Sequence, residues 1–156
     1  MDVSSFSNLA DINITEKSLI ATSGVGGGSI FIRGGQFFAD DSTIEAKTFG
    51  SKDGGVIDIR ADAISLINGA TLNGDTESTG KGTDIFLRAT DSIMAIGENS
   101  EAERSGIYAD SGFHKKLTDD NLGDVGEINL EAKNILFKDK ASPSFLVMLQ
   151  KLLYCT

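Results

Sequence analysis

A short pattern of alternating apolar residues, which recurs between glycine corners, constrains this chain more than any other feature. Its cleanest copy is residues 54–80, GGVIDIRADAISLINGATLNGDTESTG. Within that copy, apolar residues alternate in three short segments that are separated by Asn-Gly and glycine-rich corners. A period of two, rather than 3.6, predicts three short β-strands joined by tight turns.

The alternating segment occurs four times, as GSIFIRG, GVIDIRA, TDIFLRA and GEINLEA, with its first isoleucine at Ile30, Ile57, Ile85 and Ile128. The third segments, LIATSG, IEAKTFG, LNGDTESTG and IYADSG, align independently. A period of about 20–50 residues indicates a solenoid. Stacking successive turns about 4.8 Å apart pairs each strand with its counterpart in the next turn and makes three parallel sheets. We therefore predict an all-β parallel β-helix of about four coils.

The stacked coils predict internal columns of apolar side chains, one from each strand of the repeat. The positions expected to face the interior are Ile30, Ile57, Ile85, Ile128, Ile32, Ile59, Leu87, Leu130, Ile64, Leu66, Ile135, Phe137, Leu19, Ile44, Leu72 and Ile107.

The repeat defines one predicted domain, residues 1–141, followed by a tail, residues 142–156. The predicted coils are 8–26 (partial), 27–53, 54–81, 82–125 (with insertions) and 126–141 (partial). The repeat is expected to stop before Pro143, because proline lacks the N–H that a strand flanked on both sides uses. The apolar tail that follows has no glycine. Either it caps the open end, for example as a short helix, or it is a frame-shifted end.

The composition excludes several classes of protein. The formal charge of −9 disfavours binding to nucleic acid and to anionic membranes, which require clustered Lys and Arg. A single cysteine, Cys155, allows no internal disulfide and no cysteine-based zinc site. No stretch reaches the roughly 18 apolar residues of a membrane span, and the first residues lack the features of a signal peptide. We expect no metal, no cofactor and no membrane insertion.

Charged residues recur on the exterior of the predicted coils. Arg33, Arg60, Arg88 and Glu131 occupy the same position in successive turns, and we expect acids such as Asp58 to lie between the arginines. A column of like charges in isolation would be costly. The alternative is a ladder of arginines that binds a ligand.

Some β-helices cleave acidic polysaccharides, which requires two carboxylates about 5–9.5 Å apart. Asp58, Asp84 and Asn129 are the residues expected to share an outward column for this purpose. The chain has no Trp and two Tyr, so a groove for sugars is poorly furnished. We predict that the chain is not an enzyme, and a polysaccharide-binding or polysaccharide-cleaving protein is the alternative.

The insertions of the third coil are predicted to project as loops from one face, where solenoids often bind partners. The candidate partner-binding loop contains Tyr108, His114, Lys115, Lys116, Asp119 and Asp120. A solvated polar loop without a partner is the alternative.

The repeats resemble those of the filamentous-haemagglutinin-like exoproteins of bacterial two-partner secretion. The residues that carry the resemblance are Gly55, Ile57, Ile59, Ala61, Ile64, Leu66, Asn68, Gly69, Ala70, Leu72 and Thr76, with weaker copies over about residues 8–141. The resemblance implies a right-handed β-helical rod that an outer-membrane pore exports and that mediates adhesion to a host-cell receptor or glycan.

The family's signal peptide and N-terminal secretion domain do not occur in this sequence. Secretion, display at the cell surface and adhesion are therefore expectations for a parent protein of which this chain is a fragment. The open first and last coils also leave end-to-end self-association as an expectation.

Overall fold

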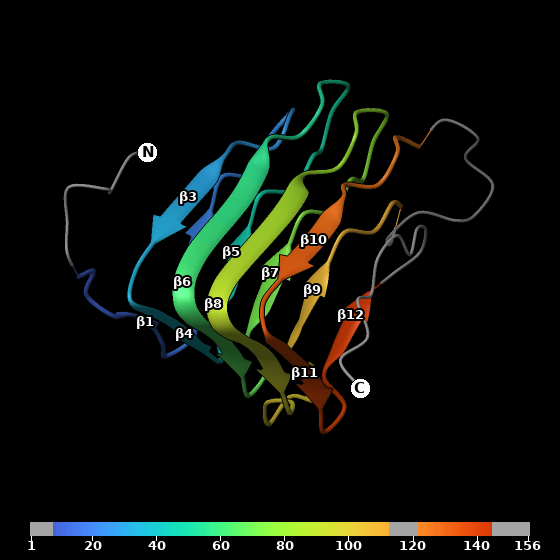
Figure 1. Ribbon diagram of the computed structural model, residues 1–156. Helices are drawn as coiled ribbons and strands as arrows, with labels where there is room; N and C mark the ends of the chain where they lie inside the picture. The colour runs from blue at the N-terminus through green and yellow to red at the C-terminus, as the bar shows by residue number, and fades with distance from the viewer. Residues whose placement is uncertain (1–7, 113–121, 145–156) are drawn as a thin grey trace.

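The computed structural model describes residues 8–112 and 122–144, and these residues form an all-β structure without a helix (Figure 1). Short strands follow one another at each repeat and lie beside their counterparts in the next. The strands are β1 (Ile12–Ile14), β2 (Leu19–Ala21), β3 (Ile30–Arg33), β4 (Gln36–Asp40), β5 (Thr43–Glu45), β6 (Val56–Ile67), β7 (Thr71–Asn73), β8 (Asp84–Ile96), β9 (Gly106–Tyr108), β10 (Ile128–Glu131), β11 (Asn134–Lys138) and β12 (Ser142–Ser144).

The strands form two hydrogen-bonded sheets in which every strand pairs in parallel with its neighbours. The seven-stranded sheet has the order β1-β4-β6-β8-β10, with β3 also pairing with β6 and β11 with β8. The five-stranded sheet has the order β2-β5-β7-β9-β12. Neighbouring strands are therefore equivalent segments of successive repeats, an arrangement compatible with a β-helical solenoid.

The structure has two sheets where the sequence predicts three, because the first two segments of a repeat fuse in the middle coils. Strands β6 and β8 run through the corner without a break, and their mutual register shifts there, between Ala61 and Ala63. In the preceding coil Gly34 and Gly35 separate β3 from β4. In the fourth coil Ala132 and Lys133 separate β10 from β11 in the same way, so the break at this corner does not require glycine.

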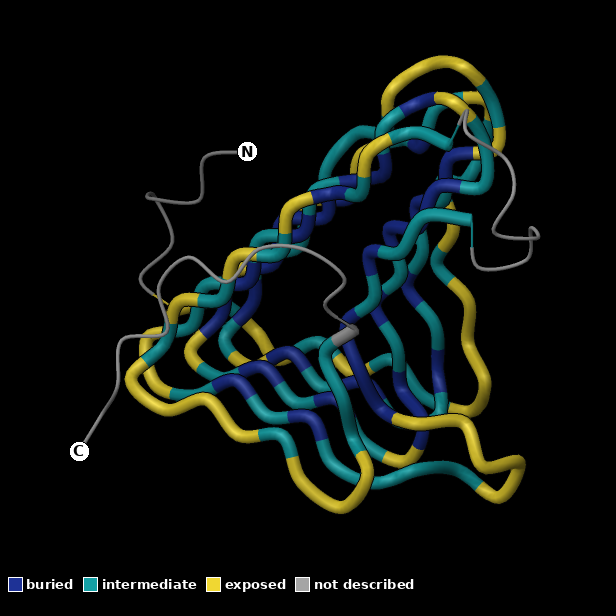
Figure 2. Tube along the Cα trace, turned by 90° about the vertical axis from the view of Figure 1, so that its right-hand side faces the viewer, coloured by how far each residue is buried: buried dark blue, intermediate teal, exposed yellow. Residues whose placement is uncertain are grey.

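The register places the predicted first-strand residues in two internal columns. Ile30, Ile57, Ile85 and Ile128 form one column, and Ile32, Ile59, Leu87 and Leu130 form the other. The members contributed by β6 and β8 are completely buried. Figure 2 shows buried positions along the strands and exposed ones gathered at the corners between them. Complete burial of such a side chain stabilises a fold by about 1.5–3 kcal/mol.

The third segments form a column as predicted in the middle coils, where Ile44, Leu72 and Ile107 are completely buried. The prediction for Leu19 is wrong. Leu19 pairs with Thr43 and is 62% exposed, and it is Ile20 that pairs with Ile44. Because side chains alternate between the two faces of a strand, a misalignment of one residue selects the wrong face.

The fourth coil continues beyond the predicted boundary at residue 141. Strand β12 pairs with β9, and Pro143 lies beside Ile107 at the edge of the five-stranded sheet. An edge strand tolerates proline because one of its sides needs no N–H donor. The expectation of a short C-terminal helix concerns residues 145–156, which lie outside the described residues.

Two buried threonines, Thr76 and Thr83, hold the glycine-rich corner that lies between them. Thr76 Oγ1 donates to the carbonyl of Gly80 at 2.6 Å, and Thr83 Oγ1 donates to the carbonyl of Ala46 at 2.5 Å. Space there is tight, since a Cβ at Gly54 would lie 2.6 Å from Thr83 Oγ1. The hydroxyls thus satisfy carbonyls that the corner removes from the strand ladder.

Candidate functional site

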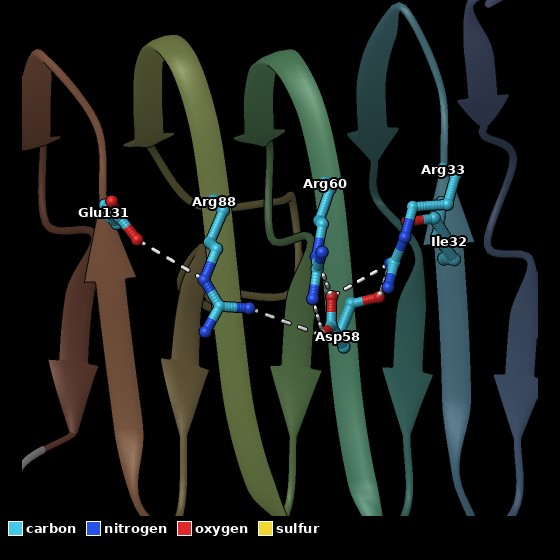
Figure 3. A network of polar contacts seen from close by, with 6 residues as sticks. All are labelled: Ile32, Arg33, Asp58, Arg60, Arg88 and Glu131. Carbon is cyan, nitrogen blue, oxygen red and sulfur yellow. Dashed lines mark hydrogen bonds and ion pairs between the residues drawn. The ribbon is translucent and has the colours of Figure 1, made fainter. Parts of the chain in front are cut away.

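The outer face of the first strands carries the densest cluster of charged side chains described in this structure (Figure 3). Strand register places Arg33, Arg60, Arg88 and Glu131 at one position of β3, β6, β8 and β10. Parallel pairing therefore brings together, as the sequence predicts, residues that are 27 or more positions apart along the chain.

Asp58, on the middle strand β6, joins the three arginines. Its carboxylate lies 2.9 Å from Arg33 Nη1 and 3.5 Å from Arg88 Nη1. Arg60 approaches the same carboxylate with two nitrogens, Nε and Nη2, each at 3.1 Å. Arg88 Nε also contacts Glu131 at 3.3 Å, so the ion pairs extend over four coils. The expected interspersed acid is thus Asp58.

Within the network the ion pair of Asp58 with Arg33 is buried, whereas the ion pairs of Asp58 with Arg60 and Arg88 are more exposed. Asp58 is 7% exposed as a residue, and the Arg33 side chain is 6% exposed. Arg33 Nη1 also donates to the main-chain carbonyls of Ile32 and Asp58, at 2.7 and 2.8 Å. The Arg60 and Arg88 side chains, in contrast, are 52% and 38% exposed. The Asp58–Arg33 contact is therefore the energetically important one.

Two opposing effects act on the pKa of Asp58. Burial raises the pKa, whereas the hydrogen bonds from Arg60 and the positive charges of Arg33, Arg60 and Arg88 lower it. The arginines prevail, and the pKa of Asp58 lies below its ordinary value. Asp58 is consequently a carboxylate at neutral pH, which suits an ion pair and not a general acid.

The structure does not place Asp58 and Asp84 in the single outward column that the sequence predicts for a catalytic pair. Asp58 lies in register with Phe31 and Phe86, while Asp84 pairs with Val56, two residues away along the strand. Asp84 contacts Lys81 Nζ at 2.6 Å and accepts the main-chain N–H of Glu127 at 2.7 Å. The expected column is therefore wrong for Asp84, whereas Asn129 does share the column of Asp58, since both lie in register with Phe86. Both carboxylates hold neighbouring coils together.

A different pair of carboxylates does share a column, on the side of the third strands. Asp75 and Asp110 follow β7 and β9 at equivalent positions, and Asp75 Oδ1 accepts the main-chain N–H of Asp110 at 2.7 Å. Burial raises the pKa of Asp75, and the nearby charge of Asp110 raises it further. Sequence reasoning missed this pair, although the aligned segments LNGDTESTG and IYADSG contain both aspartates at one position.

Of the predicted partner-binding loop, the structure describes Tyr108 alone. The Tyr108 hydroxyl donates to the carbonyl of Arg104 at 3.0 Å, and burial raises the pKa of the phenol. His114, Lys115, Lys116, Asp119 and Asp120 lie outside the described residues.

The first insertion of the third coil packs back onto earlier coils beside a shallow cavity of about 240 Å³. Asn99 Nδ2 bridges Asp41 Oδ1 at 2.9 Å and Glu103 Oε2 at 2.8 Å. Lys17 Nζ binds Glu101 at 2.5 Å across two coils, and this contact raises the pKa of Lys17. The polar groups around this cavity are occupied with one another, which indicates a structural role.

Residues 8–112 and 122–144 contain no cluster of three or more His, Cys, Asp or Glu side chains that could hold a metal ion. Within the same ranges no helix is long and apolar enough to cross a membrane. No protein-family model, curated protein or solved structure matches the chain.

Proposed function

We propose that the chain is a right-handed parallel β-helix that serves as a rigid, non-enzymatic segment of a secreted bacterial adhesin. The observation that supports this proposal best is the continuous parallel register of equivalent residues over successive coils. A stack of this kind is a rod whose length grows with the number of repeats. The haemagglutinin-like repeat pattern supplies the adhesive role and the export pore as parts of the proposal.

In this proposal the Asp58 network is a clamp that joins coils, and not a ligand site. Three arginines would repel one another at a spacing of about 4.8 Å. Asp58 and Glu131 offset that repulsion, because each lies within ion-pair distance of at least one arginine. Adhesion is then the task of the loops of the third coil, whose candidate residues include Lys115 and Lys116.

A binding assay with matched variants tests this proposal. The purified chain, labelled with a fluorophore, is titrated onto erythrocytes and onto a glycan array, and saturable binding is expected. Lys115→Ala with Lys116→Ala should weaken binding at least about tenfold. Lys138→Ala with Lys140→Ala removes the same charge from exposed positions of the fourth coil and should have little effect. A folded chain that binds neither cells nor glycans would refute the adhesive role.

Polysaccharide cleavage is a second candidate function, and the Asp75–Asp110 pair is the observation that favours it. A glycosidase uses one carboxylic acid with a raised pKa and a second carboxylate nearby. Asp75 has the raised pKa and Asp110 the neighbouring position. The assay is the release of reducing ends from a panel of neutral and acidic polysaccharides. Cleavage that disappears in Asp75→Asn but persists in Asp84→Asn would establish it, and no cleavage of any polysaccharide would exclude it.

A further inference from the structure

We propose that Asn68 is a self-modification site, at which the nitrogen of Gly69 converts the side-chain amide to a carboxyl group, and that the third coil holds this reaction in check through Ser105. This inference goes beyond the adhesive role and does not rest on it. It follows from the chemistry of the Asn-Gly corner and from the contacts that neighbouring coils make with it.

An Asn-Gly pair is the dipeptide in which an asparagine side chain reacts most readily with its own main chain. The glycine nitrogen gives up its proton and attacks Cγ of the asparagine, ammonia leaves, and a five-membered succinimide forms. Water then opens the ring at either carbonyl and gives an aspartate or an isoaspartate. Glycine favours the attack because it has no Cβ to hinder the approach. The chain contains two such pairs, Asn68-Gly69 and Asn73-Gly74.

The Asn68-Gly69 pair forms the tight turn that follows β6. Asn68 and Gly69 have φ values of 50° and 88°, and the N–H of Ala70 donates to the carbonyl of Ile67 at 3.0 Å. These are the features of a type I′ turn, which favours Asn-Gly. Asn68 is exposed and therefore open to the water that completes the reaction, whereas Gly69, which carries the attacking nitrogen, is buried.

Ser105 of the third coil occupies the attacking nitrogen. The N–H of Gly69 donates to Ser105 Oγ at 2.9 Å. Ser105 is completely buried, and its hydroxyl donates in turn to the carbonyl of Ile96 at 2.8 Å, so the oxygen is held as an acceptor. A nitrogen bound in this way retains its proton and is held away from the geometry that attack on Cγ requires.

The rest of the corner is also held by neighbouring coils. Asn68 Nδ2 donates to Asp40 Oδ1 of the preceding coil at 3.0 Å, which fixes the amide that would be lost. Asn99, in the first insertion of the third coil, lies over Gly69, since a Cβ at Gly69 would lie 2.9 Å from Asn99 Cβ. The two reacting groups are therefore restrained from opposite sides of the second coil.

Completion of the reaction would loosen this corner. A carboxylate in place of the Asn68 amide cannot donate to Asp40 and would place a second negative charge within hydrogen-bond distance of it. An isoaspartate would also add a methylene group to the main chain of a turn whose Asn68 N–H donates to Ile96 of the third coil. The contact that prevents the reaction thus protects the stacking of the second and third coils.

Peptide mapping by mass spectrometry tests the proposal, because it measures the loss of the amide at Asn68 and at Asn73 separately. Asn73 is an internal reference, since the N–H of Gly74 donates to the carbonyl of Tyr108 in the ladder between coils and makes no contact with Ser105. In the folded chain at mildly alkaline pH, Ser105→Ala should speed amide loss at Asn68 about threefold to tenfold, the factor expected for one lost hydrogen bond. The rate at Asn73 should not change.

Ser42→Ala is the matched control. Ser42 is the equivalent buried serine two coils earlier, and its hydroxyl accepts the N–H of Ser18 and donates to the carbonyl of Asp40 instead. This variant should leave the rate at Asn68 unchanged. Equal rates at Asn68 in Ser105→Ala and the natural chain would overturn the proposal. Equal acceleration at Asn68 and Asn73, or by both serine variants, would do so as well, because the effect would then be general loosening.

Two measurements on the natural chain make the test independent of any variant. Unfolding in guanidinium chloride should speed amide loss at Asn68 by more than Ser105→Ala does, because it frees both reacting groups. The N–H of Gly69 should exchange slowly with deuterium in the folded chain, although it belongs to a turn. An Asn68 that reacts as fast in the folded chain as in the unfolded one, or rapid exchange of the Gly69 N–H, would contradict the proposal.

Discussion

Replacement of Asp58 by Asn tests the clamp between coils most sharply. The substitution nearly preserves the shape of the side chain and removes its charge, so three arginines lose their shared counter-ion. The Arg33 side chain is only 6% exposed and cannot turn to bulk water without leaving the sheet face. Its guanidinium would keep main-chain carbonyls as acceptors, but its positive charge would lie buried without a carboxylate.

The expected loss in the free energy of unfolding follows from how deeply each ion pair of the network is buried. Removal of one partner of a buried ion pair typically costs about 3–5 kcal/mol, because an uncompensated charge remains. The Arg60 and Arg88 arms are more than one third exposed, and each contributes only about 0–1 kcal/mol. Asn retains an amide oxygen that accepts a hydrogen bond, which places the expected loss near the lower end, at about 3 kcal/mol.

The assay is equilibrium urea unfolding followed by far-UV circular dichroism at neutral pH. Asp84→Asn is the matched control, because Asn keeps an amide oxygen as acceptor for the Glu127 N–H and the change removes only the ion pair with the partly exposed Lys81, at a cost of about 1 kcal/mol or less. Arg33→Met combined with Asp58→Asn should cost less than the sum of the single changes. A loss below about 1 kcal/mol in Asp58→Asn would refute the assignment of a buried, structurally required carboxylate.

The remaining predictions use the same unfolding assay. Leu72→Ala should cost about 2–5 kcal/mol, whereas Leu19→Ala, at a position 62% exposed, should cost less than about 0.5 kcal/mol; equal losses would contradict the observed register. The pKa of Asp58 is lowered in the fold, so its contribution should be complete above about pH 4 and disappear as the pH falls through the folded-state pKa; an acid-unfolding profile unchanged by Asp58→Asn would contradict this. The pKa of Asp75 is raised in the fold, so ionisation of Asp75 lowers the stability of the fold. Asp75→Asn should therefore gain stability relative to the natural chain as the pH rises through the Asp75 pKa, and a constant difference between the two proteins would contradict this.

In the middle coils the sequence predicts the first and second strands well, because their apolar residues alternate and one residue of slippage would expose every isoleucine. The prediction that Ile135 is internal is wrong, since this residue of the last described coil is 39% exposed. Ile57 and Ile59 are separated by the charged Asp58, so one alignment places both inside. Where two apolar residues are adjacent, the sequence does not show which of them faces the interior. For that reason the sequence predicts Leu19 to be internal, whereas in the structure Ile20 pairs with the buried Ile44. Alternation thus determines which residues face the interior where polar residues separate the apolar ones, and it fails where two apolar residues are adjacent.

The candidate site was less predictable than the core. The column of arginines follows from the repeat, and so does its acid, because Asp58 lies two residues before Arg60 on the same strand. Asp84 was misplaced because Phe86, and not Asp84, occupies the position equivalent to Asp58. Thr76 recurs with the repeat, in a column with Thr48 and Ser111, but the main-chain carbonyls that accept from Thr76 and Thr83 leave no signal in the sequence.

The stacking of the coils is the central claim, and a distance between two spin labels tests it most directly. The labels are attached to Leu19→Cys and Ser142→Cys in a Cys155→Ser chain, which is diluted to suppress contacts between copies. These positions begin and end one column that passes through Thr43, Thr71 and Gly106. Parallel stacking predicts a narrow distribution centred at about 19 Å, before the length of the labels is added. A broad distribution, or one centred at about twice that distance or more, would contradict the parallel stack.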